Sequence, residues 1–108
     1  MTEKKWRNKV RRHYLKQGIE FKVACYAAKH DLSDALKHYG WTYVGTEQRN
    51  FSDRYLYVKE LTEDSHLFII TKYKDSEMGY FEDVISSGVG QGSAKERIHF
   101  SYVNDIFY

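Results

Sequence analysis

The 108-residue sequence contains no proline and a single cysteine, Cys25. One thiol cannot form an internal disulfide, and such sparing use of cysteine is typical of proteins in a reducing compartment. No apolar run approaches the roughly 18 residues of a membrane span, and the start of the chain lacks the apolar segment of a secretory signal. We therefore expect one domain, spanning residues 1–108, that is soluble and cytoplasmic and does not enter a membrane.

Recognisable catalytic and metal-binding patterns are also absent. Cys25 lies in an apolar run, which favours a packed thiol over a nucleophile. The residues His30, Asp34 and His38 would share one face only if a helix ran unbroken through them, and the helix-capping residue Ser33 argues against that. The sequence therefore indicates no metal ion and no cofactor, and it favours a binding protein over an enzyme.

Acidic residues are scarce at the beginning of the chain. Residues 1–18 carry Glu3 alone against seven Lys and Arg, whereas the other 90 residues carry 10 basic and 14 acidic residues. The same segment predicts a helix over 2–17, and its apolar stripe is narrow. A helix of this kind should dock peripherally on the domain and turn its cations toward water or a polyanion. The stripe consists of Trp6, Val10 and Tyr14.

Two apolar runs meet in the stretch 54–73 across a polar break at 62–65. Both runs are rich in aromatic and β-branched residues, and the break contains residues that suit a turn. The stretch predicts a β-hairpin with apolar atoms on both faces, such as Leu56 and Ile69. We expect this hairpin to be the centre of the fold.

The remaining segments predict an α+β fold. Residues 19–30 fit either a strand or a helix, and three alanines favour the helix, while 33–39 predict a short helix that ends at Gly40. Strands are expected at 41–46 and 80–85. Together these elements predict a small antiparallel sheet of about three to five strands, with amino-terminal helices packed on one face.

The segment 86–93, SSGVGQGS, predicts a flexible connection, or alternatively a loop that cradles an anion with its backbone amides. Its glycine spacing matches neither the phosphate loop nor the dinucleotide fingerprint. After it, 93–107 fits two structures. Ser93 and Glu96 have the spacing of a capping box, which favours a helix, but the aromatic and β-branched residues favour a strand paired with 80–85. We predict the strand.

The residues GVGQGSAKE at 88–96 resemble the glycine-rich turn and following basic helix of double-stranded RNA-binding domains. That family has the element order helix, three strands, helix. The present chain departs from it, because the tandem lysines of the family reduce to Lys95 and more strands are expected before the glycines. The resemblance covers about ten residues and does not establish membership.

The charge asymmetry favours a small nucleic-acid-binding regulatory protein, for RNA or DNA, whose basic helix contacts phosphates. The alternative is a protein-binding regulator or inhibitor that sets this helix and a Tyr-rich sheet against an acidic partner protein. A metal-independent ribonuclease is a third hypothesis. The oligomeric state stays open. The expected nucleic-acid-binding residues are Lys5, Arg7, Lys9, Arg11, Arg12 and Lys16, and the candidate loop contacts are Gly88, Gly90, Gly92 and Lys95.

Overall fold

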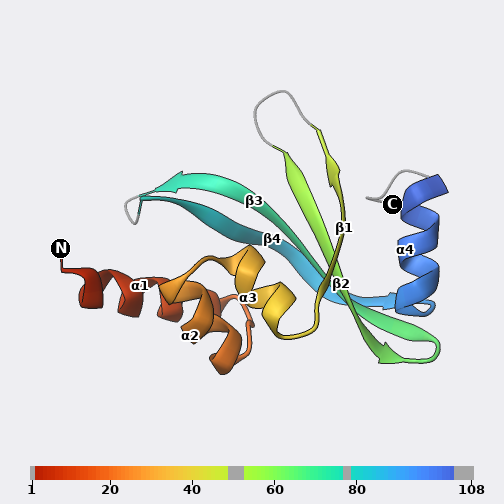
Figure 1. The fold of residues 1–108 in the computed structure, drawn as a ribbon, viewed down its shortest axis with the longest axis horizontal. Helices are drawn as coiled ribbons and strands as arrows, with labels where there is room; N and C mark the ends of the chain where they lie inside the picture. Colours follow the sequence, from red (N-terminus) through yellow and green to blue (C-terminus); the bar gives the residue numbers. More distant parts are fainter. Residues whose placement is uncertain (1, 49–52, 77–78, 104–108) are drawn as a thin grey trace.

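The computed structural model describes residues 2–48, 53–76 and 79–103. Within them the chain forms three helices, a four-stranded antiparallel sheet and a closing helix, which confirms the α+β prediction (Figure 1). Each strand pairs with the next along the chain, in the spatial order β1-β2-β3-β4. The elements are α1 (Glu3–Lys16), α2 (Phe21–Lys29), α3 (Leu32–His38), β1 (Thr42–Glu47), β2 (Arg54–Thr62), β3 (Ser65–Ser76), β4 (Gly79–Gln91) and α4 (Ala94–Val103).

Helix α1 begins and docks as its sequence predicts. The Thr2 hydroxyl accepts a hydrogen bond from the backbone N–H of Lys5 at 3.3 Å, so one of the free amides of the first turn is satisfied. Val10 and Tyr14 are buried, and Trp6 packs partly buried against the same cluster. The apolar stripe is therefore the docked face of α1.

Helices α2 and α3 follow after short connections. The helical interpretation of 19–30 is confirmed, because α2 buries Val23, Ala24 and Ala27 at helical spacing. The cap of α3 is Asp31, whose side chain accepts from the N–H of Asp34 at 2.7 Å. Sequence reasoning expected the cap two residues later, at Ser33.

The predicted hairpin is confirmed as β2 and β3, which pair antiparallel across the turn at 63–64. The side chains on its two faces pack against different helices. Tyr57 and Ile69 belong to the cluster that contains the buried residues of α1, α2 and α3. Leu56 and Val58 point the other way and pack with α4 through Ile98. The amino-terminal helices thus pack on one face of the sheet, as expected, and α4 covers the other.

The prediction of a flexible connection at 86–93 is wrong, because β4 continues to Gln91 and pairs with β3 along this length. Gly88 lies opposite Phe68, and Gly90 lies opposite His66. A Cβ atom on Gly90 would sit only 2.4 Å from the His66 ring. Gly88 and Gly90 are therefore the positions at which the Phe68 and His66 rings of β3 lie close to the backbone of β4.

The prediction of a strand at 93–107 is also wrong, since Ala94–Val103 is helix α4 and 104–107 lie outside the described residues. The capping box of Ser93 and Glu96 is formed, and it favours the helix over the strand. The Ser93 hydroxyl accepts from the N–H of Glu96 at 3.1 Å, and the Glu96 carboxylate accepts from the N–H of Ser93 at 3.2 Å. Three helices and four strands precede α4, so the element order differs from that of double-stranded RNA-binding domains.

Two expected connections fall partly outside the described residues. The connection between the strand expected at 41–46 and the hairpin at 54–73 includes residues 49–52, and the connection between the hairpin and the strand expected at 80–85 includes 77–78. Among the helices that the structure describes, none is long and apolar enough to cross a membrane.

Candidate functional sites

The exposed side of α1 carries a row of cations. Lys5, Lys9, Arg12 and Lys16 follow one another at intervals of four, three and four residues, the spacing that places side chains on one face of a helix. All four are exposed. None of them forms an ion pair with any residue in the described part of the chain. We call this row the α1 basic face.

The structure separates the other two predicted cations of α1 from this face. Arg7 forms an ion pair with Glu3, one turn earlier, and it is partly covered. Arg11 is also partly buried. Of the six predicted phosphate-binding residues on α1, four therefore lie together, whereas the helical repeat places Arg7 and Arg11 toward the other side of the helix.

The position of α1 is fixed by polar contacts with β4. His13 Nε2 lies 2.7 Å from a carboxylate oxygen of Asp83, and the Gln17 side-chain amide donates to the same oxygen at 2.7 Å. The Tyr14 hydroxyl donates to the backbone carbonyl of Glu82. These bonds hold the docked side of α1, so the basic face is held outward.

The candidate loop contacts do not join the α1 basic face. Gly88 and Gly90 lie in the paired part of β4, and the N–H of Gly92 donates to the Asp64 carbonyl at 2.7 Å. Their amides are therefore not gathered into an anion-binding loop. Lys95 is exposed at the start of α4, and α1 and α4 occupy opposite ends of the molecule (Figure 1).

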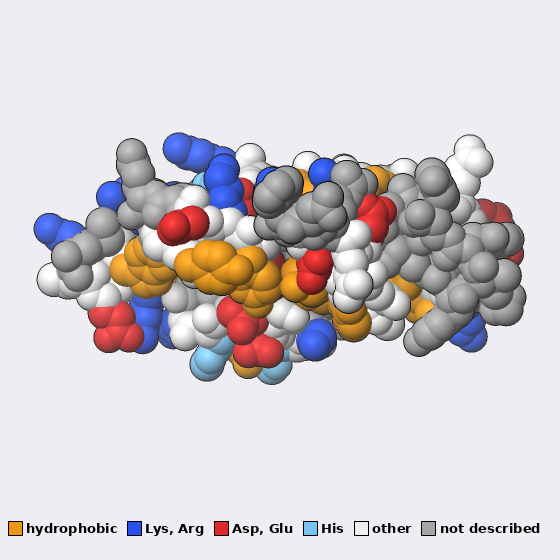
Figure 2. Space-filling model, turned by 90° about the horizontal axis from the view of Figure 1, so that it is seen from above, with side chains coloured by type: hydrophobic (Ala, Val, Ile, Leu, Met, Phe, Trp, Pro, Cys, Tyr) orange, Lys and Arg blue, Asp and Glu red, His pale blue; other side chains and the backbone are white. Residues whose placement is uncertain are grey.

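Charge is also segregated over the surface. Seen from above, Lys and Arg side chains gather mainly toward the end where α1 lies, whereas Asp and Glu side chains border a row of hydrophobic and Tyr side chains along the middle (Figure 2). This arrangement agrees with the charge asymmetry of the sequence.

A second candidate site is a polar pocket of about 190 Å³ between α3 and the sheet. Its floor includes Glu82, which is only 2% exposed. Oε2 of Glu82 accepts hydrogen bonds from the hydroxyls of Tyr57, at 3.1 Å, and Thr71. Oε1 is buried and has no hydrogen-bond partner among the described residues. Both hydrogen bonds that side chains donate to this buried carboxylate thus fall on the same oxygen.

Four tyrosines, one or two from each of three strands, line this pocket together with Ser33 and Lys37 of α3. Burial raises the pKa of Glu82, although interactions of the carboxylate with the hydroxyls of Thr71 and Tyr57 and with the backbone of Ser33 oppose the shift. Burial likewise raises the pKa of the Tyr57 hydroxyl. The tyrosines are Tyr43, Tyr55, Tyr57 and Tyr73.

Sequence reasoning missed this pocket because the strand expected at 80–85 gives no local sign that its neighbouring residues Glu82 and Asp83 are both buried. Their partners do differ, since Glu82 bonds Tyr57 and Thr71 while Asp83 bonds His13 and Gln17. Both are nevertheless buried, because helices cover β4 at this point. The available signal was the alternation of Tyr at 55 and 57, which places two hydroxyls on one sheet face.

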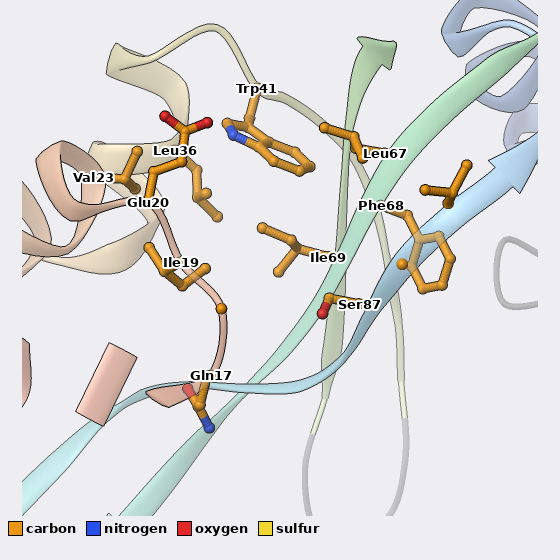
Figure 3. Close-up of a pocket in the computed structure, with 13 residues that line it drawn as sticks. Gln17, Ile19, Glu20, Val23, Leu36, Trp41, Leu67, Phe68, Ile69 and Ser87 are labelled. Carbon is orange, nitrogen blue, oxygen red and sulfur yellow. The ribbon is translucent and has the colours of Figure 1, made fainter. Parts of the chain in front are cut away.

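A further hollow is apolar, about 240 Å³ in volume, and lies between the α1–α2 connection and strands β3 and β4 (Figure 3). Ile19, Trp41 and Leu67 extend into it from three different segments (Figure 3). Its one titratable lining residue is Glu20, which is exposed. The hollow therefore offers mainly apolar contact area, with Glu20 as the one lining side chain that could exchange a proton.

The histidines considered as metal ligands lie around an aromatic ring. The ring of Tyr26 lies 4.5 Å from the ring of His30 and 4.5 Å from the ring of His38, which it stacks against. Among the described residues, no group of three or more His, Cys, Asp or Glu side chains is arranged to hold a metal ion. Cys25 is partly buried.

Comparisons with models of protein families, with curated proteins and with solved structures found no match to this chain.

Proposed function

We propose that the protein binds nucleic acid through the α1 basic face and acts as a small regulatory protein. The observation that carries the proposal is the row of four exposed cations on one helix face, with no ion pair to the described residues. Cations in such a row are available to neutralise phosphates, and the counterions that the phosphates release drive binding.

The length of the row suits a nucleic-acid backbone. Eleven residues separate Lys5 from Lys16, and a helix rises about 1.5 Å per residue, so the row spans roughly 16 Å. A DNA duplex carries one phosphate charge per about 1.7 Å of its axis. Each of the four cations can therefore reach a phosphate at the same time.

The charge of the rest of the chain limits how nucleic acid can approach. Residues 19–108 carry 14 acidic and 10 basic residues, so the body of the protein repels a polyanion while α1 attracts it. We infer binding along one face, through phosphates, without direct reading of the base sequence.

An acidic protein partner is the second candidate. It is favoured by exposed aromatic side chains on the sheet: Tyr80 is 71% exposed, and its ring stacks on Tyr73 at 5.4 Å. Tyrosine is common at protein interfaces because it offers a large apolar area with a polar tip. This partner would use the same α1 basic face.

The experiment is a titration of labelled duplex and single-stranded DNA and RNA with the wild-type protein and two charge-reversed variants. The first variant replaces the four residues of the α1 basic face with Glu. The second, a control with the same change in net charge, replaces four exposed lysines elsewhere: Lys22, Lys29, Lys37 and Lys74.

We expect the first variant to lose binding and the control to weaken it far less, because only the first removes the aligned phosphate contacts. Equal losses in the two variants would mean that net charge alone matters, and the proposal would be wrong. Binding of an acidic protein without any nucleic acid would favour the second candidate.

A further inference from the structure

The Glu82 pocket lies apart from the α1 basic face, and the proposed function makes no use of it. It is built by α3 and by all four strands, which converge on one small volume. Ligand sites commonly combine such a concave shape with a few buried polar groups. The pocket therefore has the features of a ligand site, and its lining residues indicate the class of ligand that fits it.

Tyrosine rings form the walls of the pocket. The rings of Tyr43 and Tyr57 lie 5.7 Å apart at 56°, and those of Tyr55 and Tyr73 lie 5.9 Å apart at 89°. The four tyrosines come from three different strands and all line the same pocket. The face of an aromatic ring carries negative electrostatic potential, which attracts a cation.

The floor of the pocket also favours positive charge. Glu82 is buried, and its Oε1 lacks a hydrogen-bond partner among the described residues. A buried carboxylate without full pairing is costly, and a cation placed beside it would remove that cost. The hydroxyls of Tyr57 and Thr71 already hold Oε2, so the carboxylate is fixed in position.

The negative charges around the pocket disfavour an anionic ligand. Burial, and then the charge of Glu82 and Asp31, raise the pKa of Tyr73, while burial, Asp53 and Glu82 raise the pKa of Tyr55. Three carboxylates thus act on the pocket. A phosphate would meet their repulsion, so the ribonuclease hypothesis finds no support at this site.

Lys37 is the one cation that lines the pocket. It is exposed, and its Nζ lies 5.8 Å from the centre of the Tyr43 ring. The side chain of Lys37 therefore occupies a place where a ligand cation would be attracted. Because Lys37 is long and solvated, it can leave this place when a ligand enters.

We propose that the Glu82 pocket binds an alkylated ammonium group, with the Tyr rings around its alkyl groups and the Glu82 carboxylate as its counter-charge. The group can belong to a free small molecule or to a methylated lysine side chain. An alkylated ammonium spreads its charge over methyl groups and needs few hydrogen-bond acceptors, so a buried carboxylate can act as its counter-charge without a direct hydrogen bond.

The probes are choline, free trimethyllysine and a short peptide that contains trimethyllysine. The matched control is 3,3-dimethylbutan-1-ol, which has the shape of choline without its charge. Binding is measured by calorimetry and by backbone amide shifts in NMR spectra. Choline and trimethyllysine should bind, and the neutral alcohol should not.

Four variants place the binding in the pocket. Tyr43→Leu should weaken binding roughly two- to thirtyfold, since one cation–π contact is lost, while Phe21→Leu, at an exposed aromatic residue of α2 outside the pocket, should leave binding unchanged. Glu82→Gln should weaken binding further than Tyr43→Leu. Lys37→Ala should strengthen binding, because it removes a competing cation.

The proposal is overturned if no ammonium probe binds, if the neutral alcohol binds equally well, or if Lys37→Ala weakens binding. If Glu82→Gln does not fold, the variants of the exposed residues Tyr43 and Lys37 still decide the outcome. Stronger binding of the peptide than of choline identifies a protein side chain as the source, and the reverse identifies a free metabolite. Nucleic-acid binding by α1 is tested separately and can fail without affecting this result.

Discussion

Ile69 lies in the central part of β3 and is 4% exposed, within the cluster that joins the sheet to α1, α2 and α3. Ile69→Ala removes apolar atoms and leaves a cavity between these layers. We predict a loss of about 2–4 kcal/mol in the free energy of unfolding, measured by urea denaturation. Val89→Ala is the control, because Val89 is 62% exposed on the neighbouring strand and should change stability little. Similar values for the two variants would place Ile69 outside the core.

Glu82 makes the stability of the fold depend on pH. Burial raises the pKa of its carboxyl above the ordinary 4.5, so the native state keeps this proton to higher pH than the unfolded chain does. The native state therefore binds more protons between 4.5 and the raised pKa, and stability falls as the pH rises through that window. Below the window the protonated carboxyl carries no such cost.

We predict that wild-type protein loses stability relative to Glu82→Gln as the pH rises from about 4 to 8, because the amide cannot ionise. Urea unfolding at several pH values measures the difference between the two proteins. Glu60→Gln, at an exposed position of β2, is the control and should run parallel to wild type. A constant difference between wild type and Glu82→Gln would contradict the raised pKa.

At the scale of elements, the sequence predicted correctly those helices and strands that depend on residues close together in the chain. Thr2 and the stripe from Trp6 to Tyr14 identified α1, and the polar break at 62–65 identified the hairpin of β2 and β3. Helix α4 was missed because β-propensity was weighted above the capping box. In the structure, Ser93 and Glu96 satisfy the first turn, and Ile98 gains a buried neighbour in Leu56.

The length of β4 and the Glu82 pocket depend on contacts between distant segments. The role of Gly90 is visible only once the register places it opposite His66, and no local pattern specifies that register. Likewise, the burial of Glu82 follows from Tyr57 on β2 and Ser33 on α3, far away in sequence. Sequence reasoning could name the Tyr-rich sheet but could not assemble its pocket.

The pairing of β3 with β4 supplies a prediction for the glycines. Gly90→Ala places a Cβ atom 2.4 Å from the His66 ring, which is buried and bonded through Nδ1 to the Gly92 carbonyl. The ring cannot move freely, so we expect a loss of about 1–3 kcal/mol in thermal or urea unfolding. Gly88→Ala should cost less, since its Cβ would lie 3.4 Å from the Phe68 ring. If Gly90→Ala were the milder change, the register of this strand pair would be in doubt.

At the scale of the whole molecule, the α1 basic face and the Tyr-lined pocket are separate sites. The cations of α1 gather at one end, and the carboxylates Asp31, Asp53 and Glu82 act on the Tyr-lined pocket of the sheet. A molecule arranged in this way can engage a polyanion and an organic cation without either site weakening the other. The salt sensitivity of the two binding events should differ, because one uses exposed charges and the other a buried carboxylate.

The central claim is that the α1 basic face binds phosphates, and the dependence of affinity on salt tests it most directly. With about four contacts, each contributing roughly 0.9 on duplex DNA, a plot of log affinity against log salt concentration should have a slope near −4. The measurement is a fluorescence anisotropy titration of labelled duplex at several salt concentrations. A steep slope near −4 that flattens in the variant lacking the α1 cations is the predicted result. Absence of binding even at low salt, where electrostatic attraction is strongest, would contradict the claim.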